Sequence, residues 1–163
     1  MILLSLVMFA FMFAPLVGWA GGRSSPFVAV IPFLLFANFC VMLPQIAEGG
    51  IVLEAHRWIP SLGIEAAFRL DGLSLTFALL ISGIGGAVFL YASAYLREAP
   101  RLARFYTVLT LFMASMLGAV LADDLVLLVV FWELTSLTSF LLIGYSPEEA
   151  ASRRSAQQGF LVT

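Results

Sequence analysis

Long apolar runs are the feature that most constrains what this chain can fold into. Hydrophobic residues make up 62% of its 163 residues and charged residues only 11%, whereas a soluble domain carries about 25% charged residues. A helix that crosses a bilayer needs about 20 consecutive apolar residues, and several runs approach or reach that length. Such blocks predict membrane helices, because a membrane β-barrel would show only weak alternation of polar and apolar residues.

The apolar runs divide the chain into five complete spans and the start of a sixth. We expect an all-α, polytopic helical bundle that forms a single membrane domain over residues 1–163. The expected spans are residues 2–20, 27–43, 73–96, 105–121 and 125–145, and the next span begins at residue 155. The first run lacks a basic start and a cleavage site of small residues, so we expect it to be retained as a span. In the third run, small residues recur every four positions and predict close helix packing, namely Ala78, Ser82 and Gly86.

The longest connection, residues 44–70, joins the second and third spans. Two β-prone stretches, Ile51–Leu53 and Ile64–Leu70, flank a Pro-Ser-Leu-Gly turn. They predict a short β-hairpin, and an irregular loop with an interfacial helix is the alternative. His56 in this connection is more often an ordinary surface histidine than a ligand or switch. Trp58 is expected to lie at the membrane interface.

The basic residues predict the orientation of the chain. All eight are arginines, and six fall on connections that follow the first, third and fifth spans. They are Arg23, Arg97, Arg101, Arg104, Arg153 and Arg154. The opposite side is rich in Asp and Glu. Because positive connections stay in the cytoplasm, we expect an inner-membrane protein whose N-terminus is extracytoplasmic.

Several classes of function find no support in the composition. A net charge of −2 gives no sign of a nucleic-acid partner. The single cysteine, Cys40, lies in an apolar run and is expected to be a small core residue. There is no Cys-x-x-Cys motif and no His/Cys cluster, so the sequence predicts neither a metal site nor a cofactor.

Glu133 is the one carboxylate inside an expected span, and no arginine or histidine lies inside any of them. A charge at this depth costs roughly 2.5–3.5 kcal/mol on insertion scales, and such residues usually belong to ion or proton pathways. Burial favours the protonated form of a carboxyl group and a nearby cation favours the ionised form. Glu133 is therefore a candidate for taking up and releasing protons. Every arginine lies outside the expected spans, so its cationic partner is expected on a later helix or another subunit.

Four hydroxyl residues follow Glu133 closely in the same span. Ser136 is three positions on and shares a helix face with Glu133. Together the four could line a hydrated path, or they could simply bond back to carbonyls of their own helix. The residues are Thr135, Ser136, Thr138 and Ser139.

The sequence of this span resembles that of a known family. Residues 131–145 read FWELTSLTSFLLIGY, which resembles the fifth-helix motif in the large A-type component of Mrp-type multisubunit cation/proton antiporters. Residues 69–76, RLDGLSLT, resemble the start of the third helix in the same proteins. YASAY at 91–95 and LADDL at 121–125 also fit. The wider superfamily includes proton-pumping subunits of complex I and membrane-bound hydrogenases.

The resemblance implies a transporter subunit rather than an enzyme. Glu133 would pair with a lysine on the seventh helix and move protons in exchange for Na⁺ or another cation, within a complex of several subunits in the bilayer. Arg69 and Asp71 would be structural residues of the motif. The chain ends before that lysine, so we expect an N-terminal fragment. The alternative is a proton-pumping subunit of NADH:quinone oxidoreductase or of a membrane-bound hydrogenase.

Overall fold

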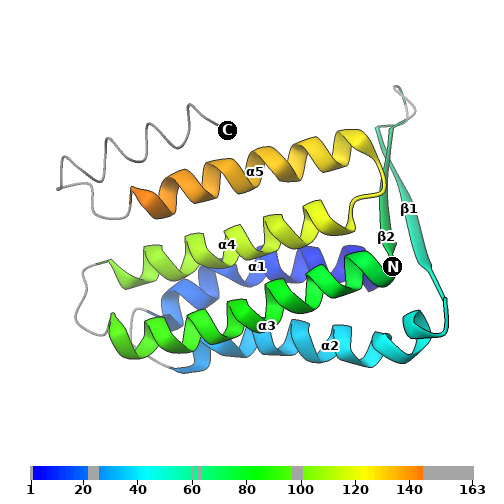
Figure 1. Ribbon diagram of the computed structural model, residues 1–163. Helices are drawn as coiled ribbons and strands as arrows, with labels where there is room; N and C mark the ends of the chain where they lie inside the picture. Colours follow the sequence, from blue (N-terminus) through cyan, green and yellow to red (C-terminus); the bar gives the residue numbers. More distant parts are fainter. Residues whose placement is uncertain (1, 22–25, 60, 62–63, 97–100, 145–163) are drawn as a thin grey trace.

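Five long helices lie side by side in the computed structural model, which describes residues 2–21, 26–59, 61, 64–96 and 101–144 (Figure 1). Each helix is long and apolar enough to cross a membrane. A short 3₁₀ turn, η1 (Pro26–Ala29), leads into the second helix. The helices are α1 (Ile2–Gly21), α2 (Val30–Ala47), α3 (Gly72–Tyr95), α4 (Leu102–Leu121) and α5 (Leu125–Ile143).

The five expected spans are confirmed, with differences at their ends. Helix α2 continues to Ala47, four residues beyond the expected end, because Pro44 does not break it. Membrane helices tolerate such a proline when other groups satisfy the freed backbone. Helix α4 begins at Leu102 and so includes Arg104 in its first turn, since a long arginine side chain can reach water from a helix end. The expected sixth span lies outside the described residues.

A two-stranded antiparallel β-hairpin crosses one end of the helices, as Figure 1 shows. Strands β1 (Val52–Ile59) and β2 (Ile64–Leu70) confirm the expected hairpin. Strand β1 runs well past the expected Ile51–Leu53 stretch. The sequence hides this extension, because its inward positions are polar: Glu54 and His56 are half-buried, whereas Leu53 is exposed.

Small residues set how closely the helices approach. In α1, a side chain at Gly18 would meet the carbonyl oxygen of Ala103 in α4. In α3, the stripe Ala78, Ser82 and Gly86 is buried, and a Cβ on Gly86 would lie 2.9 Å from the ring of Phe33 in α2. The close packing expected from that stripe is confirmed.

The expectation that Cys40 is a core residue is wrong. Helix α2 buries one face against its neighbours, and Cys40 lies exposed outside that face. In a membrane helix an apolar position can face lipid as readily as protein, so hydrophobicity alone does not reveal which residues are buried.

Candidate functional site

Helix α5 packs against the rest of the bundle through one face only. Its buried residues are Leu127, Phe131 and Thr138. The ring of Phe131 lies over Gly118 of α4, which leaves no room for a side chain at that glycine. The same ring is 6.3 Å from the ring of Phe68 in β2, centroid to centroid. These contacts fix the rotation of α5 about its own axis.

Glu133 lies on the opposite side of α5 from this packed face. It follows Phe131 by two residues, which is about 200° around an α-helix. Its side chain is exposed, and it is the ninth of the 19 residues of α5. Within the described ranges, its carboxylate has no hydrogen bond and no ion pair. The structure thus presents a carboxylate near the middle of a membrane span with no partner from α1 to α5.

The described arginines lie in other elements than α5, which carries Glu133. The arginines that the structure describes are in the hairpin or at the start of α4: Arg57, Arg69, Arg101 and Arg104. None of the arginines in the described ranges falls in the middle of a span. A cation that faces Glu133 therefore has to come from outside these helices.

The hydroxyl residues after Glu133 bond mainly to their own helix. Thr135 Oγ1 donates to the carbonyl oxygen of Trp132 at 2.6 Å, and Ser136 Oγ donates to the same oxygen at 3.4 Å. Thr138 Oγ1 donates to the carbonyl oxygen of Leu134 at 2.7 Å and is turned into the packed side. Ser139 is half-buried. Of the four, Ser136 is the one that α5 brings towards the side of Glu133.

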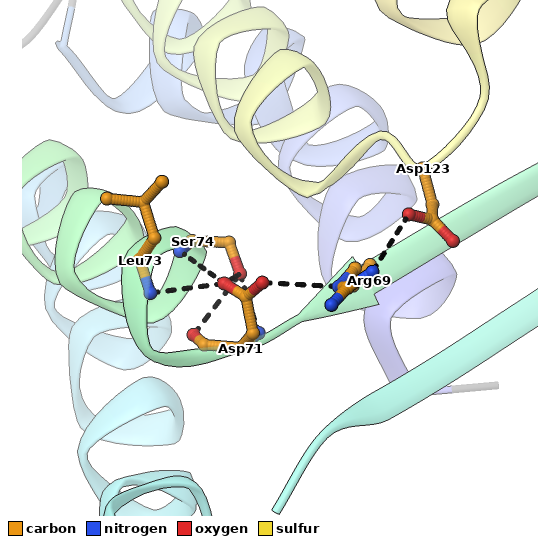
Figure 2. A network of polar contacts seen from close by, with 5 residues as sticks. All are labelled: Arg69, Asp71, Leu73, Ser74 and Asp123. Atoms are coloured by element: carbon orange, nitrogen blue, oxygen red, sulfur yellow. Dashed lines mark hydrogen bonds and ion pairs between the residues drawn. The ribbon is translucent and has the colours of Figure 1, made fainter. Parts of the chain in front are cut away.

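The start of α3 holds a second group of charged residues, drawn in Figure 2. Asp71 caps the helix: its Oδ1 accepts from the backbone N–H groups of Leu73 at 3.1 Å and Ser74 at 3.0 Å. Ser74 Oγ in turn accepts from the Asp71 backbone N–H at 2.8 Å. These reciprocal bonds satisfy donors that a helix N-terminus leaves free.

Arg69 links this cap to the connection between α4 and α5. Its Nε donates to Asp71 Oδ2 at 3.2 Å, and its Nη1 lies 3.8 Å from Asp123 Oδ1 (Figure 2). Hydrogen bonds from Ser74 hold the pKa of Asp71 below its ordinary value, and the charge of Arg69 adds to this effect. Asp71 is thus ionised at neutral pH and occupied as a cap.

The two aspartates before α5 have different partners. Asp124 caps α5, and its Oδ1 accepts from the backbone N–H groups of Val126 at 2.8 Å and Leu127 at 3.1 Å. Asp124 is thus the N-cap of α5. Asp123 instead faces Arg69, and its backbone N–H donates to the Ala67 carbonyl oxygen at 2.9 Å. The connection into the helix that carries Glu133 is therefore tied to β2 through Asp123, two residues before α5 begins.

Glu54 of β1 has a role that was not expected from the sequence. Its carboxylate accepts backbone hydrogen bonds from the first turn of α1, including Leu3 at 3.1 Å and Leu4 at 3.3 Å. Burial alone would raise the pKa of Glu54, but the hydrogen bonds that its carboxylate accepts, including these, outweigh burial and the pKa lies below its ordinary value. The available signal was its place at an inward position of a strand.

His56 is half-buried rather than a plain surface residue. Its Nδ1 is shielded from solvent and has no hydrogen-bond partner among the described residues. Among all the residues that the structure describes, no three His, Cys, Asp or Glu residues lie closely enough together to hold a metal ion.

Comparisons with known proteins now bear on these features. Residues 58–106 match the family model described as NADH-ubiquinone oxidoreductase (complex I), chain 5 N-terminus. The chain is 49% identical over 138 residues to the A-type subunit of the Na⁺/H⁺ antiporter of Alkalihalophilus pseudofirmus. It is 44% identical over 137 residues to the A1-type subunit of the Na⁺/H⁺ antiporter of Staphylococcus haemolyticus. Each alignment covers 84% of this chain and 17% of the relative, so the chain spans about a sixth of their length.

Solved structures share the fold. The Mrp complex from a Dietzia species matches 99% of this chain and 18% of its own, with a TM-score of 0.79 and 33% identity. An archaeal membrane-bound sulfane sulfur reductase matches 98% of this chain and 25% of its own. Its TM-score is 0.71 at 18% identity, which shows a common fold and no more.

Proposed function

We propose, on the premise that the chain is homologous to the N-terminal part of the A-type component of Mrp-type Na⁺/H⁺ antiporters, that Glu133 carries protons across the middle of the membrane. The chain is a multi-pass membrane protein. It would supply one carboxylate of a longer path, and the remaining groups would come from outside α1 to α5.

One observation carries this proposal: Glu133 is uncovered and without a partner in the described part of the chain, near the middle of α5. A charge left there costs roughly 2.5–3.5 kcal/mol on insertion scales. A partner of opposite charge would offset this cost, and the sequence resemblance implies a lysine of a later helix. A carboxylate whose charge depends on such a partner can bind a proton and release it as the partner moves.

The cation, the partner subunits and the orientation are part of the same proposal. The relatives are named as Na⁺/H⁺ antiporters and the matched structure as a complex, so we infer Na⁺ as the exchanged cation and other subunits as neighbours.

We infer that the hairpin is extracytoplasmic, because six of the eight arginines lie in connections at the opposite end of the helices. Labelling a Glu65→Cys variant with a membrane-impermeant maleimide from outside the cell checks this orientation.

A second candidate is a proton-pumping subunit of a respiratory complex. The match of residues 58–106 to the complex I family favours it. In that setting Glu133 would have the same proton chemistry, but redox energy rather than a sodium gradient would drive it. The 44% and 49% identities to antiporter components make the antiporter the better supported function.

Sodium-driven proton movement in everted vesicles tests the proposal. The variants are made in the complete A-type component, assembled with its complex. We expect Glu133→Gln to lower the exchange rate by about 10²-fold or more, as for loss of a group that transfers protons. Glu133→Asp keeps a carboxylate and is expected to retain part of the rate.

Glu65→Gln is the matched control. It removes a carboxylate by the same isosteric change, but from an exposed position on β2. We expect exchange at the wild-type rate. If Glu133→Gln exchanged as fast as the control, Glu133 would not lie on the proton path.

A further inference from the structure

An open pocket of about 510 Å³ lies below the hairpin, between α1 and α5. Its wall is apolar along both helices and polar only where β1 crosses. The apolar residues include Leu4, Met8 and Phe11 of α1 and Leu127, Val130 and Leu134 of α5. His56, Arg57 and Trp58 of β1 line the other end.

The length of the apolar wall matches one leaflet of a bilayer. Helix α1 begins at Ile2 and its last lining residue is Phe11, whereas α5 begins at Leu125 and its last is Leu134. In each helix these two residues lie nine positions apart, or about 14 Å at 1.5 Å per residue. The hydrocarbon core is about 30 Å thick, so the wall ends close to the midplane.

The polar end of the pocket is basic. Arg57 is exposed, and within the described ranges its guanidinium has no ion pair or hydrogen bond. Its cross-strand neighbour is Glu65, but no ion pair joins the two. Trp58 is about half exposed beside it, as expected for an aromatic residue at headgroup level. The pocket therefore has an exposed arginine at its rim, above an apolar wall as deep as one leaflet.

We propose that this pocket binds an anionic phospholipid of the outer leaflet. The phosphate would lie against Arg57, since guanidinium groups are strong phosphate donors. One acyl chain would run down the wall between α1 and α5 as far as Leu134. His56 lines the same end and adds an imidazole N–H that can donate to a headgroup oxygen.

Quenching of Trp58 fluorescence by brominated lipids tests this inference. The purified chain carries Trp19→Phe and Trp132→Phe, which leaves Trp58 as the sole tryptophan of the three. It is placed in nanodiscs in which brominated phosphatidylglycerol or brominated phosphatidylcholine replaces unlabelled lipid in steps. We expect half-maximal quenching at an about fivefold lower mole fraction of the anionic lipid, as for one basic residue near the surface.

Variants assign the preference to the pocket. Arg57→Gln is expected to abolish the difference between the two lipids, and Arg57→Lys to keep most of it. Glu65→Gln, which removes the neighbouring negative charge, is expected to widen it. Arg104→Gln is the matched control, because this exposed arginine lies at the opposite end of the bundle, and it is expected to leave the difference unchanged.

Two outcomes would overturn the inference. Equal half-maximal fractions for both lipids in the parent chain would show that the headgroup charge does not affect lipid binding at the pocket. Absence of quenching by either lipid would show that protein, and not an acyl chain, fills the pocket.

Discussion

The carboxylates at the hairpin end of the bundle differ from the carboxylate in the middle of α5 in the partners that they have. At the hairpin end, four of the six carboxylates have a partner, either the backbone of a helix start or Arg69: Glu54, Asp71, Asp123 and Asp124. The other two, Glu48 and Glu65, are exposed outside the spans. In the middle of α5, Glu133 has none within the described ranges.

This difference distinguishes carboxylates that stabilise the folded chain from a carboxylate that does not. A carboxylate at a helix N-terminus near water lowers the free energy of the folded chain, because it satisfies backbone donors and interacts favourably with the helix dipole. A carboxylate in the bilayer raises that free energy unless it is paired. Glu54, Asp71 and Asp124 thus account for how α1, α3 and α5 begin. The cost of placing Glu133 in the bilayer requires a reason other than stability.

The largest change in free energy is expected when the cost of placing Glu133 in the bilayer is removed. Glu133→Leu should improve the apparent free energy of membrane insertion of the α5 segment by about 3 kcal/mol, because the penalty for the acid disappears. A glycosylation-mapping assay of insertion measures it. The same exchange at Glu65, outside the spans, should leave α5 unaffected. An unchanged insertion free energy for Glu133→Leu would mean that Glu133 is not at membrane depth.

A smaller effect is expected from the contact that fixes the rotation of α5. Gly118→Ala places a methyl group against the ring of Phe131 and should destabilise the chain by about 1–3 kcal/mol through overpacking. Unfolding in SDS followed by circular dichroism measures this change. Gly72→Ala is the control, because a Cβ there has no atom within 4 Å. Equal stability of the two variants would imply that another face of α5 meets α4, and Glu133 would then not point away from it.

The smallest effect concerns pH at the hairpin. Because the pKa of Glu54 is lowered in the folded chain, its contribution is complete above its ordinary value of 4.5 and is lost as the pH falls through the folded value. The protection factors of the Leu3 and Leu4 amides, which are corrected for the intrinsic slowing of hydrogen exchange in acid, should therefore fall on acidification below that range. Glu54→Gln should remove this dependence at a cost of about 1 kcal/mol or less. Protection factors that show the same pH dependence in Glu54→Gln as in the wild type would contradict the assignment.

Much of the fold was open to prediction because the bilayer demands it. Apolar runs of spanning length have to be helices, since helices satisfy their backbone within one segment. Residues 64–70 alternate and follow a turn, so β2 was predicted to the residue. Strand β1 was cut short, because its inward positions carry Glu54 and His56 and the usual pattern of apolar inward residues is reversed.

The candidate site was only partly visible in the sequence. Glu133 was identifiable by its depth alone, and the cap at Asp124 by its place before a helix. The side of α5 on which Glu133 lies was not, because α5 has apolar residues on every side and its rotation depends on the contact between Phe131 and Gly118. Nor could the sequence show that Thr135 and Thr138 donate to carbonyls of their own helix.

Infrared difference spectroscopy of the complete A-type component, assembled in the complex proposed above, tests the central claim most directly. Spectra are recorded with and without Na⁺ over a range of pH, for the wild type and for Glu133→Gln. The account predicts a carbonyl band of a protonated carboxylic acid that changes with Na⁺ and pH in the wild type and is missing from the variant. Identical difference spectra for the two proteins, together with sodium-dependent exchange by both, would contradict a proton-carrying role for Glu133.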